Sequence, residues 1–295
     1  MAVDISVIIA CRDHSVELQN CLNSLAAQET KLHFEVIVAN SGRNDHLQKL
    51  TKEFAFVQLI ESEKMLLPGA ARNLGVEYAK ADKICFIDAD CVAKNNWVDE
   101  AFNALKNNFI LAGGAVLDLY PFHLIASTDN RLQFVDFARQ RPAGRSDYFP
   151  ACNMAILKNI FEEAGKFRED LEAGEDVLLT TRIAEQWTRK VCFIPSMIVY
   201  HAGRTGLMDF LTHQKKFGYY RGLLGLKMSR NLRWLSTKPY LNWVVALRRL
   251  GYICLRVLQW DTLDMPRFIL QFPVLLVGLV SWTKGYYEGI RESRD

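Results

Sequence analysis

Four short apolar runs in the N-terminal third restrict the fold of this chain more than any other feature of its sequence. Each run is continuous and rich in Val and Ile, which is typical of strands covered on both faces of a parallel sheet. Helical patterns lie between the runs, as where Leu18, Leu22 and Leu25 fall on one helix face. The sequence therefore predicts an α/β fold with a doubly wound, mostly parallel sheet. The predicted strands are Ile5–Ala10, Phe34–Ala39, Phe56–Ile60 and Lys83–Ile87.

Polar loops follow these strands at the carboxyl edge, where such sheets bind ligands. One of them is Asp88-Ala89-Asp90, and on an extended backbone its two carboxylates would project to the same side. Neighbouring carboxylates repel each other unless a cation neutralises them, and Mg²⁺ or Mn²⁺ prefers oxygen ligands that substrate phosphates complete. The pair thus indicates a site for a metal and a pyrophosphate. A solvated turn is the alternative.

A second acidic pair, Glu175-Asp176, follows Gly174 and precedes a predicted helix at about 176–187 and a strand at about 191–200. A carboxylate at a helix start can serve as an N-cap for free backbone N–H groups. It can also be a general base that takes a proton from an acceptor hydroxyl. Both interpretations stay open on this motif alone.

These features and an ordered series of further motifs resemble inverting glycosyltransferases of family 2 with the GT-A fold, over roughly residues 4–206. The motifs, in chain order, are Ile5-Ser6-Val7-Ile8-Ile9-Ala10, Glu35-Val36-Ile37-Val38, Gly69-Ala70-Ala71-Arg72-Asn73-Leu74-Gly75, Phe86-Ile87-Asp88-Ala89-Asp90, Cys152-Asn153-Met154-Ala155, Gly165-Lys166-Phe167, Gly174-Glu175-Asp176 with Arg182, and Pro195 followed by Tyr200-His201. The resemblance implies a GT-A catalytic domain over residues 1–206.

The resemblance also implies roles for single residues. Asp176 would be the catalytic base, and Glu175 would shape the acceptor pocket. Asp88 and Asp90 would bind the ribose and the metal, Mn²⁺ or Mg²⁺, with His201 as a further metal ligand; for the histidine, a simple hydrogen bond at a strand end is the alternative. The residues implied in binding the nucleotide sugar are Ala10, Cys11, Arg12, Asn40, Ser41, Arg72, Asp88 and Asn153.

One motif departs from the family pattern. After the second strand the family usually has Asp-Asp-Gly-Ser, whereas this chain has Asn40-Ser41-Gly42-Arg43. The carboxylate that commonly reads the uracil imide is therefore missing. Because Asn40 both donates and accepts hydrogen bonds, it is compatible with uracil. We favour a UDP-sugar donor over a GDP- or dTDP-sugar.

The implied reaction is a direct displacement. The metal offsets charge on the nucleoside diphosphate while Asp176 deprotonates the acceptor hydroxyl, which attacks the anomeric carbon from the opposite face and inverts it. One alternative is a nucleotidyltransferase, which would usually carry a glycine-rich phosphate loop at residues 11–15. The other is a catalytically inactive GT-A membrane scaffold, suggested by the missing Asp-Asp and opposed by the three aspartates at the predicted site.

Positive charge is concentrated near the C-terminus. The whole chain has a formal net charge of only +3, which does not favour a nucleic-acid partner. Residues 203–260 hold eleven Lys and Arg against one acid, Asp209, and their apolar residues recur at helical spacing. The segment His213–Gly222 is similar to a glutamine-and-arginine segment of membrane-associated family members, without the strict Q-x-x-R-W pattern of processive synthases. We predict a basic amphipathic and hydrophobic helical region over residues 207–295.

The uncharged segment Phe268–Thr283 has sixteen residues, whereas a membrane-spanning helix needs about 20. Pro273 and Gly278 weaken it further, so we favour a segment that lies in the plane of an anionic membrane surface or inserts shallowly. A buried hairpin helix is the alternative. The acceptor would then be a glycan or a lipid-linked saccharide.

The compartment is predicted from the cysteines and the N-terminus. Seven cysteines without a C-x-x-C pair, most of them in apolar runs, indicate reduced buried thiols in the cytosol. Met1-Ala2-Val3-Asp4 lacks the basic start of a secretory signal. We therefore expect a protein without a signal peptide at the cytoplasmic face of a membrane.

Overall fold

The computed structural model describes residues 2–12, 15–225 and 242–293, and the chain divides into two compact units. The sheet unit comprises Met1–Leu117 and Pro142–His201, and the helical unit comprises Asp118–Arg141 and Ala202–Asp295. The predicted domain boundary at residue 206 lies close to the change of unit after His201. The structure differs in grouping residues 118–141 with the C-terminal helices, whereas the sequence analysis assigned them to the catalytic domain.

In the part of the chain that the structure describes, eight strands form one sheet in the order β3-β2-β1-β4-β7-β6-β8-β5. The first four in this order are the predicted strands, and they pair in parallel, which confirms the α/β fold class. The pairings of β4 with β7, β6 with β7 and β5 with β8 are antiparallel, so the sheet is mixed. The strands are β1 (Ile5–Cys11), β2 (Phe34–Ser41), β3 (Val57–Ser62), β4 (Lys83–Ile87), β5 (Cys91–Ala93), β6 (Leu111–Asp118), β7 (Asn153–Leu157) and β8 (Val191–His201).

Helices connect the parallel strands, and their apolar faces are buried as predicted. Leu18, Leu22 and Leu25 of the first helix are fully buried. Gly75 lets the third helix lie close to β1, because a Cβ atom there would come within 2.5 Å of the Ile8 side chain. The helices of this unit are α1 (Ser15–Ala26), α2 (Asp45–Lys52), α3 (Pro68–Glu77), α4 (Trp97–Lys106), α6 (Lys158–Glu163) and α7 (Glu175–Gln186), with a 3₁₀ turn at Thr188–Lys190.

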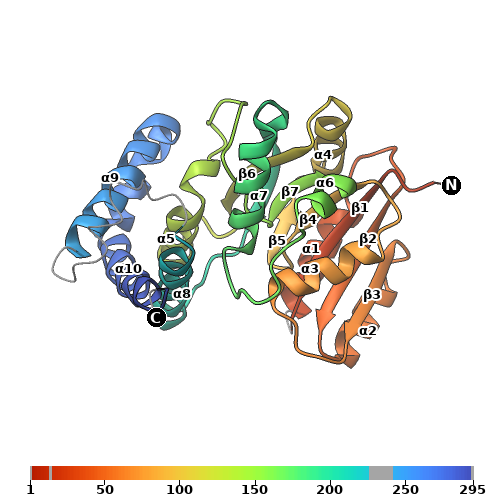
Figure 1. The fold of residues 1–295 in the computed structure, drawn as a ribbon, viewed down its shortest axis with the longest axis horizontal. Coiled ribbons are helices and arrows are strands. Elements are labelled where there is room, and N and C mark those ends of the chain that lie inside the picture. The colour runs from red at the N-terminus through yellow and green to blue at the C-terminus, as the bar shows by residue number, and fades with distance from the viewer. Residues whose placement is uncertain (1, 13–14, 226–241, 294–295) are drawn as a thin grey trace. The chain divides into compact units, whose positions relative to one another are not determined.

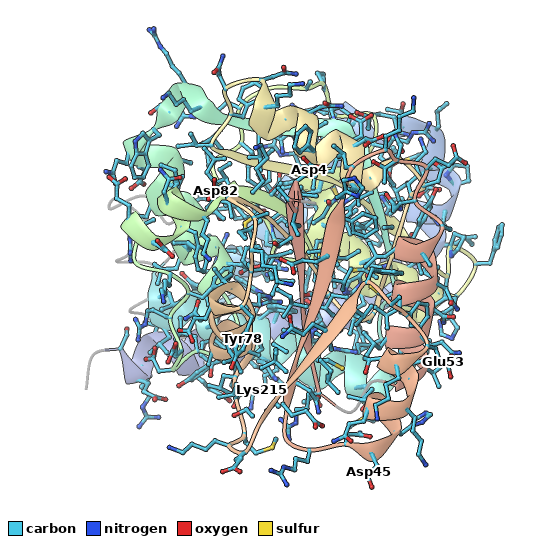
Figure 2. The ribbon with its side chains drawn as sticks, turned by 90° about the vertical axis from the view of Figure 1, so that its right-hand side faces the viewer. Asp4, Asp45, Glu53, Tyr78, Asp82 and Lys215 are labelled. Atoms are coloured by element: carbon cyan, nitrogen blue, oxygen red, sulfur yellow. The ribbon has the colours of Figure 1, made fainter. Side chains whose placement is uncertain are left out.

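Figure 2 shows the two edges of the parallel half of the sheet. Asp4 and Asp82, which immediately precede β1 and β4, lie toward one edge. Asp45, which begins α2 after β2, lies at the opposite edge. The parallel strands therefore all end at the edge where the predicted ligand-binding loops begin.

The helical unit consists of α5 (Leu124–Phe134), α8 (Leu207–Leu224), α9 (Asn242–Trp260) and α10 (Met265–Glu292), with 3₁₀ turns at Val135–Phe137 and Thr262–Asp264. Figure 1 shows α8 and α10 lying side by side, with α5 and α9 against α10. Two parts of the predicted basic region, α8 and α9, are thus helical. The remainder of that prediction falls on residues 226–241, outside the described residues.

Glycines bring the backbones of α8 and α10 into contact. A Cβ atom on Gly218 would lie 1.9 Å from the carbonyl oxygen of Trp282, and one on Gly285 would lie 1.9 Å from that of Lys215. Gly222 and Gly289 make equivalent contacts one turn later, which shows that the two helices run parallel. Small residues four apart on both helices are the pattern that allows such close approach between membrane helices.

A buried arginine joins α5 to the C-terminal helices. The Arg131 guanidinium donates to Asp261 Oδ2 at 2.7 Å and to Gln271 Oε1 at 2.5 Å, and it also pairs with Asp264. Leu132, the next residue, belongs to the same apolar cluster as Phe210 of α8. These contacts explain why residues 118–141 belong to the helical unit.

The predicted uncharged segment lies inside α10, which continues through Pro273 and is 28 residues long. Among the described residues one helix, Thr262–Glu292 with its preceding turn, is long and apolar enough to cross a membrane, which by itself is weak evidence. Only 28% of its most apolar window is buried. This exposure disfavours the alternative of a buried hairpin helix.

Candidate active site

Asp88 and Asp90 lie in a tight turn between β4 and β5, where the Cys91 N–H donates to the Asp88 carbonyl at 3.0 Å. The backbone there is a turn and not the extended strand that the sequence argument assumed. The two carboxylates consequently have different neighbours. Asp88 Oδ1 accepts from Arg72 Nη2 at 2.6 Å, whereas Asp90 Oδ1 lies 3.6 Å from His201 Nε2.

Asp90 and His201, both predicted metal ligands, come together with Cys91. Their ligand atoms all lie within 4.8 Å of one another, the one group of this kind among the described residues. The pairing of β5 with β8 sets Cys91 directly opposite His201, and both side chains are buried. Carboxylate and imidazole donors fit Mn²⁺, so the residues present fit the implied metal. Asp88, the third predicted ligand, is outside this group.

Arg72 of α3 lies between two carboxylates. Its Nη1 donates to Glu175 Oε1 at 2.6 Å, and its Nη2 donates to Asp88 Oδ1 at the same distance. The guanidinium also stacks over the Phe167 ring, and the side chain is only 7% exposed. Burial acts against its charge, but Asp88 and Glu175 outweigh burial and raise the pKa of Arg72.

Glu175 is buried, with 5% of its side chain exposed, and its carboxylate faces Arg72. Burial and the neighbouring Asp176 raise the pKa of Glu175 to about 7, while Arg72 opposes this shift. The resemblance implied that Glu175 shapes the acceptor pocket. The structure gives it a different contact, because its carboxylate fixes the guanidinium of Arg72.

Asp176 is the second residue of α7, and two backbone N–H groups hold its carboxylate. Oδ2 accepts from the Ala151 N–H at 2.9 Å and Oδ1 accepts from the Val177 N–H at 2.7 Å. The N-cap position of α7 belongs to Gly174, but Asp176 satisfies one N–H group of the first turn, so a structural role at the helix start remains beside the role of a base. Burial raises the pKa of Asp176, and the bonds to Ala151 and Val177 oppose the shift.

The predicted nucleotide loops begin side by side, because Cys11 pairs with Asn40 in the parallel register of β1 and β2. Asn40 is 1% exposed and donates through Nδ2 to the Gly42 carbonyl at 2.8 Å. Its Oδ1 is buried without a hydrogen-bond partner among the described residues. The Ser41 hydroxyl is occupied by the backbone of Leu66, accepting from its N–H at 2.6 Å. Arg12 is exposed at the end of β1.

Asn153 is set apart from these residues. It is fully buried, and its Oδ1 accepts from Trp97 Nε1 while its Nδ2 donates to the carbonyls of Ala115 and Met197. Each polar atom of the side chain therefore has a partner within the sheet unit. This prediction needs correction, because an amide satisfied in this way ties strands together and is not available to a nucleotide sugar.

Two features of the site escaped the sequence analysis. Cys91 stands in the sequence beside Asp90, but its approach to His201 depends on the pairing of β5 with β8. The Arg72 contact with Glu175 joins residues 103 positions apart. No local signal in the sequence marks either contact, because both depend on how distant segments pair.

Comparison with known proteins identifies the family of this chain. Residues 6–164 match the family described as Glycosyl transferase family 2. The glycosyltransferase AglE of Haloferax volcanii is 26% identical over 188 residues, a match that covers 61% of this chain and 61% of that relative's length.

Two solved structures resemble the fold. One is the mannosyltransferase PcManGT from Pyrobaculum calidifontis in complex with GDP-Man and Mn²⁺. Its TM-score is 0.61 at 14% sequence identity, and the match covers 97% of this chain and 87% of the PcManGT chain. The other is S. aureus TarS 1–349 in complex with UDP-GlcNAc. Its TM-score is 0.54 at 14% sequence identity, and the match covers 100% of this chain and 92% of the TarS chain.

Proposed function

Because the chain belongs to glycosyl transferase family 2, we propose that it moves a sugar from a nucleotide-sugar donor to an acceptor hydroxyl with inversion and with the help of a divalent metal. The chain is a glycosyltransferase with a GT-A-like fold; the donor, the stereochemistry and the metal are the proposed parts.

The contacts of Arg72 carry the proposal. Its Nη2 pairs with Asp88, in the turn that would bind the ribose and the metal. Its Nη1 pairs with Glu175, the residue before the proposed base Asp176. A single rigid cation thus fixes the distance between the donor side and the base-bearing helix. Holding reacting groups in position is one of the larger sources of enzymatic rate enhancement.

In the proposed reaction Asp176 accepts the proton of the acceptor hydroxyl. Its carboxylate is held by the N–H groups of Ala151 and Val177, and its raised pKa makes it a stronger base than an exposed aspartate. Asp90 and His201 would hold Mn²⁺ or Mg²⁺, which when bound offsets charge on the diphosphate leaving group. Attack from the face opposite the leaving group inverts the anomeric carbon.

The unpaired Oδ1 of Asn40 supports recognition of the base. Since its Nδ2 is already bonded to Gly42, only an acceptor remains, and an imide N–H would satisfy it. Uracil presents such a group, in agreement with the preference for a UDP-sugar. Guanine and thymine present one too, so binding should be compared among UDP-, GDP- and dTDP-sugars.

The first test is metal-dependent donor binding. Thermal stabilisation by each nucleotide sugar is measured with Mn²⁺, with Mg²⁺ and with a chelator; a ligand at 100 times its Kd stabilises by about 2.7 kcal/mol. Asp90→Asn should abolish the metal-dependent part of this stabilisation. The matched control is Asp82→Asn, at the other end of β4. Donor affinity that is unchanged by chelator would contradict the metal role.

The products separate the alternatives. Release of the nucleoside diphosphate supports sugar transfer, whereas release of pyrophosphate would indicate a nucleotidyltransferase. Donor binding without turnover of any acceptor would favour the inactive scaffold. The family match supports the first outcome.

We also place the helical unit on an anionic membrane surface at the cytoplasmic face, as a proposal that rests on its exposed residues. One face of α10 exposes apolar side chains at helical spacing, including Ile269 at 64%, Leu276 at 41% and Val280 at 55%. On α9, Trp243 and Leu247 are exposed beside the exposed Arg248. Apolar burial combined with basic residues suits a lipid surface and a glycan or lipid-linked acceptor.

Sedimentation with liposomes tests this placement. The intact chain should bind vesicles that contain anionic lipid, and Val280→Lys together with Leu276→Lys should weaken binding because both charges enter the apolar face of α10. A chain that stays in the supernatant with anionic vesicles at low salt would contradict it.

A further inference from the structure

The group formed by Asp90, Cys91 and His201 contains a sulfur ligand. Cys91 Sγ lies 4.0 Å from Asp90 Oδ1, and His201 Nε2 lies 3.6 Å from the same oxygen. In a tetrahedral zinc site, ligand atoms about 2.0–2.3 Å from the ion lie roughly 3.3–3.6 Å from one another. Two of the three separations are therefore within about half an ångström of that spacing, and all three atoms lie within 4.8 Å of one another.

The backbone fixes the sulfur in this place. Cys91 begins β5 and His201 ends β8, and the antiparallel register pairs these two residues. Both are buried, at 0% and 7% exposure, so their side chains have little freedom. The second thiol of this region, Cys152, lies within hydrogen-bonding reach of Cys91.

Sulfur changes which cations such a group selects. Mg²⁺ prefers oxygen ligands and keeps several waters, whereas thiolate and imidazole ligands suit Zn²⁺ and its spectroscopic substitutes Co²⁺ and Cd²⁺. Three protein ligands leave a fourth position open. Coordination exchanges the S–H bond of Cys91 for a metal–sulfur bond, and the proton is released to solvent.

We propose that Cys91 is a third protein ligand beside Asp90 and His201, and that the group binds borderline and soft divalent cations, of which Zn²⁺ is the biological example, in preference to Mg²⁺. The inference rests on the proposed function only in assigning Asp90 and His201 to a metal. A sulfur–metal bond is a binding property and does not require turnover.

Cd²⁺ is the probe, because a thiolate ligand gives it a charge-transfer absorption that oxygen and nitrogen ligands do not. The full reduced chain, freed of metal, is titrated with Cd²⁺ and separately with Mg²⁺. We expect one absorption band that saturates at one Cd²⁺ per chain and that Mg²⁺ does not produce. Cys91→Ser should remove the band, and Cys254→Ser, a change at the least buried cysteine, should keep it.

A second variant covers the case in which Cys91→Ser does not fold. His201→Gln removes a different ligand, so Cd²⁺ should bind at least about tenfold more weakly while the saturated band persists. Absence of the band in the unmodified chain would overturn the inference, as would a full band in Cys91→Ser or unchanged Cd²⁺ affinity in His201→Gln. Donor turnover that fails with every metal while the band is present would count against the proposed function alone.

Discussion

The two units of this protein use polar and apolar residues in opposite ways. In the sheet unit the strands are buried and apolar, and at the carboxyl edge the buried Arg72 pairs with Asp88 and Glu175. In the helical unit charges such as Arg131 and Asp129 are buried among helices, while apolar side chains on α9 and α10 are exposed. The two units therefore differ in where they place buried charge and exposed apolar surface.

Asp129 illustrates the packing role. It is fully buried, and its carboxylate accepts from Gln214 Nε2 at 2.8 Å and from the Arg204 N–H at 3.1 Å, with His213 Nδ1 3.2 Å away. These bonds lower the pKa of Asp129 despite burial, which acts to raise it. Gln214, which lies in the segment similar to the family's glutamine segment, is thereby bonded through its Nε2, while its buried Oε1 has no hydrogen-bond partner among the described residues.

The largest expected effect is on catalysis in the sheet unit. Asp176→Asn keeps an oxygen for the Ala151 N–H but removes the base and sets an NH₂ group against the Val177 N–H, so transfer should fall roughly 10²–10⁴-fold, far more than the accompanying loss of Tm accounts for. Glu185→Gln, an exposed change on the same helix, is the control. Near-normal turnover of the Asn variant would show that Asp176 has a structural role, like that of Asp129 in the helical unit.

The next effect is on stability in the helical unit. Arg131→Met removes the cation that pairs with Asp261 and the donor to the buried Gln271, while Asp264 keeps Arg267, so the free energy of unfolding should fall by about 3 kcal/mol in urea titrations. Arg248→Met on exposed α9 should change it by less than about 0.5 kcal/mol. Equal effects of the two variants would remove the distinction between buried and surface charge in this unit.

A smaller effect sharpens the packing argument. Gly218→Ala forces a methyl group against the Trp282 carbonyl and should cost about 1–3 kcal/mol of unfolding free energy. The same change at Gly251 of α9, where no described atom outside its own helix lies within 4 Å, should stabilise by roughly 0.5–1 kcal/mol through helix propensity. A stabilised Gly218→Ala variant would show that α8 and α10 do not touch along their backbones.

A separate effect concerns pH. The pKa of Glu175 is raised to about 7 in the folded chain from an ordinary value of 4.5, so the folded state holds a proton that the unfolded state loses first. The contribution of Glu175 to the free energy of unfolding therefore decreases as the pH rises from about 4.5 to about 7, and it stays constant above that range. Glu175→Gln should flatten this decline in urea titrations at pH 5 and pH 7.5, whereas Glu185→Gln should follow the unmodified chain.

The strands and the acidic motifs could be predicted because their signals are local. A run such as Ile5–Ala10 shows its burial in its own composition, and Asp88, Asp90 and Asp176 stand beside strands or helices that the pattern already defines. The glycines of α8 and α10 were also visible as pairs four residues apart, although the sequence analysis did not use them.

The rest depends on contacts between distant residues. Residues 118–141 group with the C-terminal helices through single polar pairs such as Arg131 with Asp261, 130 positions apart. The motif that contains Asn153 predicts it as a nucleotide-sugar ligand. Its hydrogen bonds to the carbonyls of Ala115 and Met197 can be seen only in the structure. Hydrophobic periodicity carries no information on such pairs.

His201 is the last residue of the sheet unit, and Ala202 begins the helical unit. A histidine proposed to grip an ion therefore stands one peptide bond from a junction in the chain. Residues 202–206 lie between it and α8, which begins at Leu207. A truncation of the chain from residue 202 onward therefore keeps every proposed ligand, whereas a truncation that starts a single residue earlier removes one.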